Sequence, residues 1–309
     1  MTRITNYAQN QQTLFYLQNL QQQMANTQNQ ITTGLVSQNY AGLGTNTSQL
    51  VSLQSVESQV NQFASNAQSV NQQLTSMESA TTQLFNIATN AQTLLQSALN
   101  AQTASDVNLS QQATNMLDQV QAILNTQLGG QYLFAGTATN TAPVDVNAPG
   151  FATPPSVYPT SADTGYYQGN DTKLSAPVDS NYDLTYGVTA DAPGFEELIR
   201  SLRLAATTNV GPPSDSNRLN EALRVAQQAI QDIPNITGQI GSSQAAIQTV
   251  QAQQTDFTQF ANKTIGDISN VDVTQAVSQL SQQQTTLEAS YQVIARLSQM
   301  NLAQFLPVA

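Results

Sequence analysis

The chain has 309 residues and a formal net charge of −11, yet only 9% of its residues are charged, so neutral side chains must form most of its polar surface. It contains no cysteine, histidine or tryptophan, which removes the usual ligands of zinc, copper, haem and iron–sulfur centres and the histidine of a catalytic triad. With only eight Lys and Arg residues it lacks the basic surface that nucleic-acid phosphates require. We therefore expect no cofactor, no bound metal, no enzymatic activity and no nucleic-acid partner.

The N-terminal segment predicts a long amphipathic helix over Tyr7–Thr33. Its apolar residues Leu17, Met24 and Ile31 are seven residues apart, and Leu14 lies on the same stripe, which is typical of a coiled-coil seam. Because nothing in this segment resembles the apolar region of a secretory signal, we expect no cleavable signal peptide. No run of about 20 apolar residues follows anywhere, so no membrane insertion is expected.

Two further helices are predicted in the N-terminal half. A glycine-containing break at Ala41–Thr45 precedes a long helical pattern over Leu50–Ala101. Ser105 and Asp106 predict a turn, and the next helix is expected to continue to Leu128, where two glycines end it.

Prolines mark the middle of the chain, where seven of them lie between Pro143 and Pro193. Proline breaks helices, so residues 137–193 predict a small β-rich insert, with a half-buried strand over Tyr182–Val188. Helices return at Gly194–Ala206 and at Asp215–Lys263, and Pro234 should kink or break the second of them.

The C-terminal segment predicts a second narrow apolar seam. Leu280, Leu287 and Ile294 are seven residues apart and are flanked by Val277 and Tyr291. Two narrow seams at opposite ends of a chain most simply bury each other. The predicted assembly seam, which contains no catalytic or metal-binding residue, comprises Leu14, Leu17, Met24, Ile31, Val277, Leu280, Leu287, Tyr291 and Ile294.

Both terminal helices are almost free of charge. No residue from Ile4 to Val56 is charged, and from Val273 to Ala309 only Glu288 and Arg296 are. Neutral amides suit a helix that becomes buried among copies of itself, because buried unpaired charges cost far more than hydrogen-bonded amides. The alternative is that these Gln- and Asn-rich ends are disordered in the free monomer and become ordered on assembly.

The fold class expected from these patterns is mainly α, a long helical coiled coil and bundle built from both chain ends with a small β-rich inserted domain. The predicted division has three parts. Residues 1–40 and 272–309 form a terminal coiled-coil assembly layer, residues 41–136 and 194–271 a helical bundle domain, and residues 137–193 a β-rich outer insert domain.

One acidic cluster resembles the opening of a calcium-binding loop. Asp179, Asn181 and Asp183 match the opening of such a loop, but Leu184 stands where glycine is needed and Ala190 where a bidentate glutamate is needed. The sequence therefore favours a polar turn at the edge of a strand.

Three stretches resemble the bacterial flagellin family. Residues 31–35 are similar to a region of its N-terminal domains. Residues 130–136, Gly-Gln-Tyr-Leu-Phe-Ala-Gly, are similar to a segment typical of its hook-associated proteins, and residues 271–291, together with Leu297 to Leu306, are similar to its C-terminal helix. The second and third stretches favour the hook-associated proteins of the hook–filament junction over filament flagellins. In the family, a basic residue and an acidic pair usually follow the glycine at position 34, and an Arg usually precedes the Gly238 position. This chain has none of these residues, and their absence affects partner specificity more than the fold.

The resemblance implies a structural role outside the cell. It implies terminal helices that form an inner coiled-coil layer, export through the flagellar channel without signal cleavage, and a location in the extracellular flagellum. The implied partners are further copies of the chain, other flagellar axial proteins, namely the hook-side junction protein and flagellin, and an export chaperone on the C-terminal helix.

Two other hypotheses stay open at this point. Within the same class, the chain could be a main or minor filament flagellin with a short insert. In a different class, it could be a secreted binding module that uses its tyrosine-rich insert. Self-assembly separates them, because a filament protein should polymerise alone, a junction protein should need the hook end, and a binding module should stay monomeric.

Overall fold

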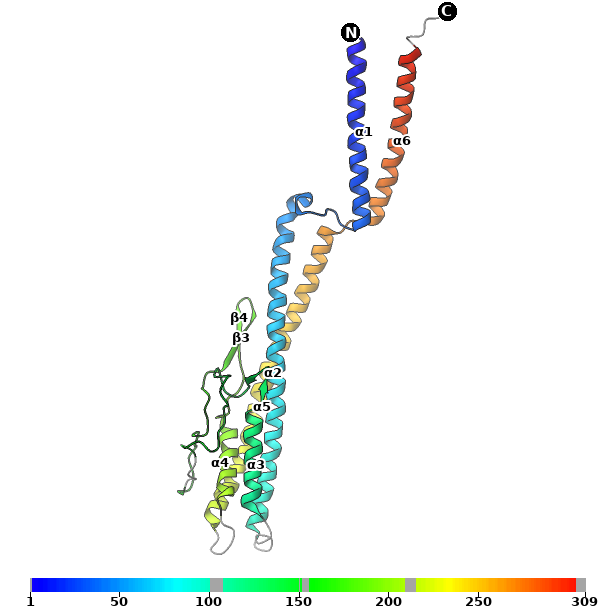
Figure 1. Cartoon of the computed structure of the whole chain (residues 1–309). Helices are drawn as coiled ribbons and strands as arrows, with labels where there is room; N and C mark the ends of the chain where they lie inside the picture. Colours follow the sequence, from blue (N-terminus) through cyan, green and yellow to red (C-terminus); the bar gives the residue numbers. More distant parts are fainter. Residues whose placement is uncertain (1, 101–107, 150, 152–155, 209–214, 304–309) are drawn as a thin grey trace, which may run out of the picture. The chain divides into compact units, whose positions relative to one another are not determined.

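The computed structural model describes residues 2–100, 108–149, 151, 156–208 and 215–303, which form two compact units (Figure 1). The first unit combines Met1–Ser58 with Phe257–Ala309, and the second is Gln59–Asp256. The three-part division expected above stays a prediction. The described α-helices are α1 (Thr2–Thr33), α2 (Thr47–Leu99), α3 (Leu109–Leu124), α4 (Pro193–Ala206), α5 (Ser216–Ser269) and α6 (Val273–Ala303).

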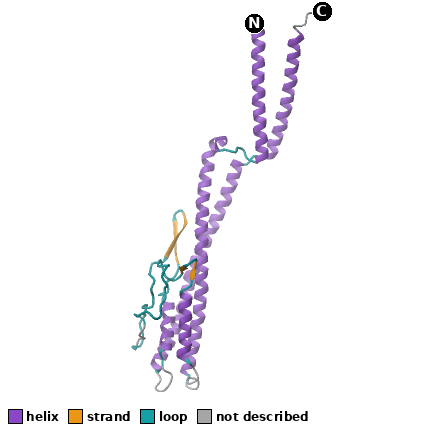
Figure 2. Ribbon diagram, viewed as in Figure 1, coloured by secondary structure: helices purple, strands orange, loops and turns teal. Residues whose placement is uncertain are grey.

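Strands form only a small part of the described chain, as Figure 2 shows. β1 (Gln127–Leu128) pairs with β2 (Gln131–Tyr132), and β3 (Leu174–Asp179) pairs with β4 (Tyr182–Tyr186), both antiparallel. A 3-10 helix, η1 (Tyr40–Asn46), follows α1. The mainly helical fold with a small inserted β region is thereby confirmed. None of the helices that the structure describes is both long and apolar enough to span a membrane.

The predicted end of α3 was wrong by four residues. The helix stops at Leu124 because the side chain of the next residue, Asn125, binds the backbone of Val144. Nδ2 of Asn125 donates to the Val144 carbonyl at 2.8 Å, and Oδ1 accepts from the Val144 amide at 2.9 Å. Residues 127–132 then form the β1–β2 hairpin around two glycines with positive φ, Gly129 and Gly130. The predicted turn at Ser105 and Asp106 lies outside the described residues.

Pro234 does not break α5, which continues from Ser216 to Ser269. Ile233, Ile236 and Ile240 are all buried on either side of the proline. Their burial holds the backbone helical, because tertiary packing outweighs the local cost of a missing N–H.

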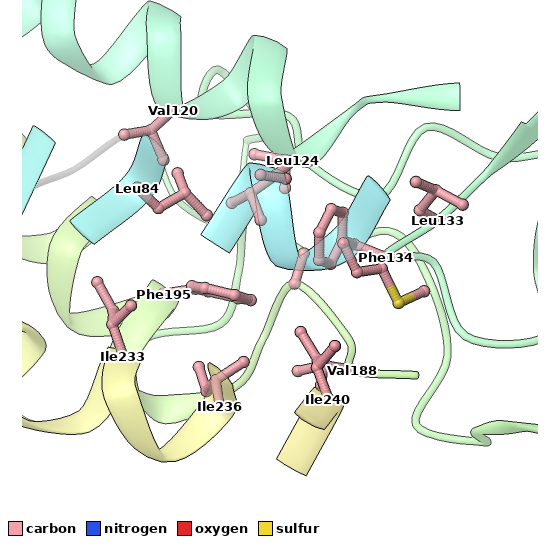
Figure 3. Close-up of a cluster of buried hydrophobic side chains, with 14 of the residues drawn as sticks. Leu84, Val120, Leu124, Leu133, Phe134, Val188, Phe195, Ile233, Ile236 and Ile240 are labelled. Carbon is pink, nitrogen blue, oxygen red and sulfur yellow. The ribbon is translucent and has the colours of Figure 1, made fainter. Parts of the chain in front are cut away.

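The main core of the second unit is built from α2, α3, α4 and α5 together with the insert (Figure 3). Phe134, which follows β2 and precedes the insert, and Phe195 from α4 meet edge to face, with ring centroids 5.8 Å apart. The other three helices contribute to the same cluster with Leu84 of α2, Val120 of α3 and Ile233 of α5. A smaller cluster of leucines and alanines joins α2, α3, α4 and α5 beside it.

The segment Gly130–Gly136 anchors the insert to this core. Leu133, Phe134 and Ala135 are buried, and the carbonyls of the last two accept hydrogen bonds from the amides of Ala190 and Asn170. Gly136 has a φ of +64°, and a Cβ atom there would overlap the Asn170 carbonyl. The close approach of these two backbones therefore requires glycine.

The predicted acidic cluster forms a turn, as the sequence favoured, since Asp179 ends β3 and Tyr182 begins β4. Two helix side chains donate hydrogen bonds to backbone carbonyls of β3. Asn66 of α2 donates to the Pro177 carbonyl at 3.0 Å, and Gln254 of α5 donates to the Val178 carbonyl at 2.7 Å. These bonds fix the hairpin to the bundle.

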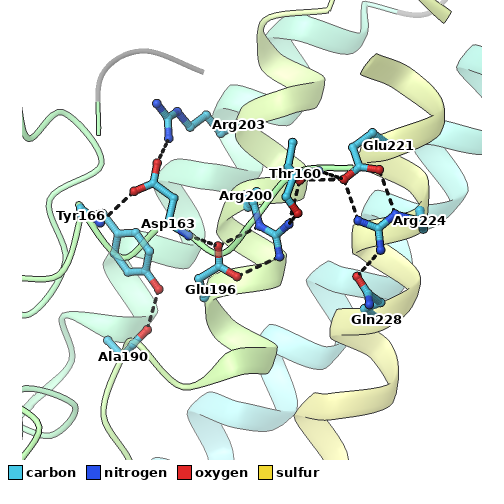
Figure 4. A network of polar contacts seen from close by, with 11 residues as sticks. Thr160, Asp163, Tyr166, Ala190, Glu196, Arg200, Arg203, Glu221, Arg224 and Gln228 are labelled. Atoms are coloured by element: carbon cyan, nitrogen blue, oxygen red, sulfur yellow. Dashed lines mark hydrogen bonds and ion pairs between the residues drawn. The ribbon is translucent and has the colours of Figure 1, made fainter. Parts of the chain in front are cut away.

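A buried polar network ties the loop of residues 156–166 to α4 and α5 (Figure 4). Arg200 donates to both carboxylate oxygens of Glu196, at 2.8 and 3.1 Å, and to the carbonyl and hydroxyl oxygens of Thr160. Thr160 in turn donates to Glu221, which also binds Arg224. The network satisfies charges that would otherwise be costly to bury.

Glu197 lies next to this network and has a raised pKa. Burial and the nearby carboxylate of Asp232 raise the pKa of Glu197 from 4.5 to about 7, and its Oε2 atom is buried without a hydrogen-bond partner. A carboxyl whose pKa is raised in the folded state destabilises that state progressively as pH rises from the unfolded to the folded pKa. The Arg224 hydrogen bond instead lowers the pKa of Glu221 to about 2, so its stabilisation is lost only as pH falls below the unfolded value.

We expect the free energy of unfolding to fall by on the order of 2 kcal/mol between about pH 5 and pH 8 because Glu197 must ionise while buried. Glu197→Gln should remove this decrease, whereas Glu221→Gln should leave it in place. Urea unfolding of the three proteins at the two pH values measures this. If the free energy of unfolding of Glu197→Gln falls as much as that of the wild type, a group other than Glu197 causes the pH dependence.

Candidate assembly surface

In the first unit, α1 and α6 lie side by side and antiparallel, so that α1 begins where α6 ends (Figure 1). A short β-bridge between Leu35 and Asn270 closes the other end of the pair. There the amide of Val36 donates to Ser269 and the amide of Val271 donates to Gly34, at 2.8 and 2.9 Å. This bridge fixes the register between the two helices.

The residues between the two helices recur at alternating steps of four and three, which is the spacing of a coiled-coil seam. All of them are buried or half-buried. The α1–α6 seam consists of Thr13, Leu17, Leu20, Met24, Thr27 and Ile31 on α1, and of Ala276, Leu280, Gln283, Leu287, Ser290 and Ile294 on α6.

Six of the nine residues of the predicted assembly seam lie in this α1–α6 seam. Leu17 is buried, and the half-buried members are Met24, Ile31, Leu280, Leu287 and Ile294. The other three, Leu14, Val277 and Tyr291, are exposed to 50%, 49% and 48%. Each of them follows a seam position by one residue and therefore lies at the edge of the seam. The hydroxyl of Tyr291 still reaches α1 there, where it accepts a hydrogen bond from Nε2 of Gln21 at 2.9 Å.

Sequence reasoning missed the polar residues of the seam. Thr27, Gln283 and Ser290 occupy seam positions although their side chains are polar. A search for the four-and-three spacing without regard to polarity would have found them. The role of all these residues in assembly stays a prediction at this point.

The pair leaves a considerable apolar surface uncovered. Besides Leu14 and Val277, the aromatic side chains of Phe15 and Tyr16 are more than 60% exposed. Beside them lies a cavity of about 260 Å³ lined by residues of both helices, including Leu17, Leu20 and Ser290. Of these residues, Leu14, Phe15 and Tyr16 are consecutive in α1, and a cluster of exposed apolar side chains is typical of a surface that another protein covers.

The described residues are mostly apolar or carry neutral polar side chains. They contain no group of three or more carboxylate, imidazole or thiol side chains that could hold a metal ion. Apart from Glu288 and Arg296, the described part of α6 carries no charge, and the described part of α1 from Ile4 onward carries none. Contacts across such a surface rely on apolar burial and on hydrogen bonds between amides.

Two family models match the two ends of the chain. The bacterial flagellin N-terminal helical region matches residues 4–139, and the bacterial flagellin C-terminal helical region matches residues 223–306. Together they span more than two thirds of the chain. The chain belongs to the bacterial flagellin family. The N-terminal match includes α1 and the Gly130–Gly136 segment, and the C-terminal match includes α6, so both helices of the α1–α6 seam lie within the flagellin regions.

Solved structures share the fold of this flagellin-family chain. Bacillus cereus FlgL matches with a TM-score of 0.56 and 18% identity, over 69% of this chain and 98% of its own. A Vibrio parahaemolyticus protein described as a flagellar hook-associated protein matches with a TM-score of 0.58 and 16% identity, over 75% and 99%. Flagellar hook-associated protein-3 from Legionella pneumophila matches with a TM-score of 0.55 and 11% identity, over 70% and 98%. No curated protein matches the chain.

Proposed function

We propose that this chain is a structural subunit of the bacterial flagellum that joins the hook to the filament and assembles through its terminal helices. The observation that carries the proposal is the α1–α6 pair, which carries very few charged residues and leaves Leu14, Phe15, Val277 and Tyr291 exposed. Three matched structures with the same fold are named FlgL or hook-associated protein, which supports the junction in preference to the filament.

The proposal includes the partners of the chain. The exposed apolar side chains of the pair are to be covered by further copies of the chain and by the neighbouring axial proteins, the hook-side junction protein on one side and flagellin on the other. These apolar side chains are exposed to water before assembly. The proposal therefore includes an export chaperone that covers α6. The location is the extracellular flagellum, reached without signal cleavage, and the role needs no catalysis.

Replacing exposed apolar residues tests the proposal with little effect on the folded monomer. In Leu14→Ser/Val277→Ser both side chains are already exposed, so the free energy of unfolding should change by no more than about 0.5 kcal/mol for each. Assembly should weaken by at least about tenfold, because each buried aliphatic side chain contributes about 1.5–3 kcal/mol. The matched control is Gln12→Ser/Gln279→Ser, at exposed polar positions of the same helices.

Binding to isolated flagellar hooks that carry the hook-side junction protein, followed by sedimentation and electron microscopy, gives the readout. Wild-type protein should add to hook ends and stop after a short ring, and the control should do the same. Long tubes formed by wild-type protein without hooks would favour the filament flagellin, the second candidate, which the names of the two family models support. A wild-type monomer that neither polymerises nor binds hooks would contradict both and favour a secreted binding module.

A further inference from the structure

The first turn of α4 packs closely against α5. A Cβ atom on Gly194 would lie 2.8 Å from the backbone nitrogen of Ile233 and 3.0 Å from the carbonyl carbon of Asp232, so this approach requires glycine. Phe195 and Ile233 lie beside it in the main core (Figure 3). Glu197 follows Gly194 by three residues and therefore lies on the same face of α4. Its carboxyl group is thereby held against the turn of α5 that carries Asp232.

The carboxyl group of Glu197 meets another carboxyl group and no donor. The residue is 8% exposed, and within the described part of the chain nothing hydrogen-bonds to its buried Oε2 atom. The side chain within hydrogen-bond reach is Asp232, which already accepts a hydrogen bond from Nδ2 of Asn235 at 3.2 Å. Two carboxyl groups can hydrogen-bond to each other only if one of them holds a proton. Glu197 is the one to hold it, because Asp232 is only half-buried and burial disfavours the charged form.

The other charges around Glu197 come from the two packed helices and do not replace this proton. On α4, Glu196 raises the pKa of Glu197 and Arg200 lowers it, and on α5 Arg224 is also close enough to interact with Glu197. Arg200 binds Glu196 at 2.8 Å and Arg224 binds Glu221 at 2.6 Å. Both guanidinium groups are therefore engaged with other carboxylates, and loss of the proton leaves Glu197 facing Asp232 as two like charges.

The turn of α5 that faces Glu197 is weak in its own hydrogen bonding. Pro234 has no backbone N–H, so it donates no helical hydrogen bond to the carbonyl of Ile230. Gly238, one turn further on, lowers the helix propensity, and a Cβ atom there would meet nothing within 4 Å. This turn therefore depends on its contacts with neighbouring helices, and the contact between Glu197 and Asp232 is one that a proton controls.

We propose that Glu197 and Asp232 form a proton-sensitive latch that holds the first turn of α4 against the Pro234 turn of α5. With one shared proton, the two carboxyl groups hydrogen-bond and the latch is closed. When the proton leaves to solvent, the two carboxylates repel each other, so the two turns separate locally while the rest of the unit stays folded. The latch is closed in acidic solution and opens as pH rises through about 7. This local transition is distinct from the fall in global stability expected above, and it does not depend on the proposed function.

Hydrogen exchange of backbone amides in the full-length protein tests the latch, at about pH 5 and about pH 8 and corrected for the intrinsic effect of pH on exchange. We expect the protection of amides in residues 195–199 and 233–239 to fall by at least about tenfold between the two pH values. The slowest amides of α2 and α3 should lose less protection than these. Glu197→Gln should abolish the local loss, because its amide donates to Asp232 at either pH. Asp232→Asn should reduce the loss to less than about threefold, because its amide donates to the ionised Glu197.

The matched control is Asp118→Asn, which changes an exposed carboxylate of α3 in the same unit and should behave as the wild type does. Equal losses for all slow amides of the unit would show that Glu197 acts only on global unfolding, and this result overturns the latch. An absence of local loss in the wild-type protein overturns it as well. A full local loss in Glu197→Gln or in Asp232→Asn has the same consequence, because another group or burial alone is then its cause.

Discussion

Arg200→Met should destabilise the second unit by about 3–5 kcal/mol, the cost of leaving a buried charge without its partner. Arg200 and Glu196 are both nearly inaccessible to solvent, and two hydrogen bonds join their charged groups. Methionine fills much of the same volume, so the loss reports the charge and its hydrogen bonds rather than a cavity. Urea or thermal unfolding of the full-length protein measures it.

The double variant Glu196→Gln/Arg200→Met is the control. Glutamine removes the orphaned charge but keeps an oxygen for the Asp163 amide, which donates to Glu196 at 2.9 Å. We expect the double variant to recover more than half of the lost stability. If it is as unstable as Arg200→Met, the loss arises from the two hydrogen bonds to Thr160, and the buried ion pair contributes little.

Gly136→Ala should destabilise the same unit by about 3 kcal/mol, from a positive φ that disfavours alanine and from overlap with a neighbouring backbone. The added Cβ would lie 2.8 Å from the Thr172 carbonyl and closer still to that of Asn170. Neither carbonyl can move freely, because the amide of Thr137 donates to Thr172 at 3.0 Å and the Tyr167 hydroxyl donates to Asn170 at 2.7 Å. Chemical unfolding and protease resistance of the insert provide the measurement.

Gly129→Ala separates the two contributions. Gly129 has a similar φ of +60°, but a Cβ atom there meets nothing within 4 Å. Its variant should therefore lose only the conformational part, about 1 kcal/mol. Equal losses for the two variants would show that the backbone around Gly136 yields to the added methyl group.

Periodic features of the chain could be predicted from the sequence because they are local. The heptad spacing of Leu17, Met24 and Ile31 and the proline-rich middle predicted the helices and the insert. Which apolar residues pair within one chain could not be predicted in this way. Leu14 and Leu17 are equally apolar, and only the register with α6 leaves the first exposed and the second buried.

The polar network of the second unit also lies beyond sequence reasoning. Thr160 and Glu221 are 61 residues apart, and nothing in the local pattern around either of them indicates the other. Glu196 and Glu197 are adjacent in sequence but meet opposite surroundings, since the first binds Arg200 and the second lies near Asp232. Their difference depends on which helix face each occupies against α5.

The scarcity of charge on α1 and α6 has a consequence for how their contacts respond to salt. Dissolved salt weakens attractions between charges by screening them, and it has little effect of this kind on apolar burial or on bonds between neutral amides. Since no residue from Ile4 to Val56 is charged, contacts through α1 do not depend on screening. Contacts between subunits that are made through α1 would therefore have similar strength at low and at high salt concentration.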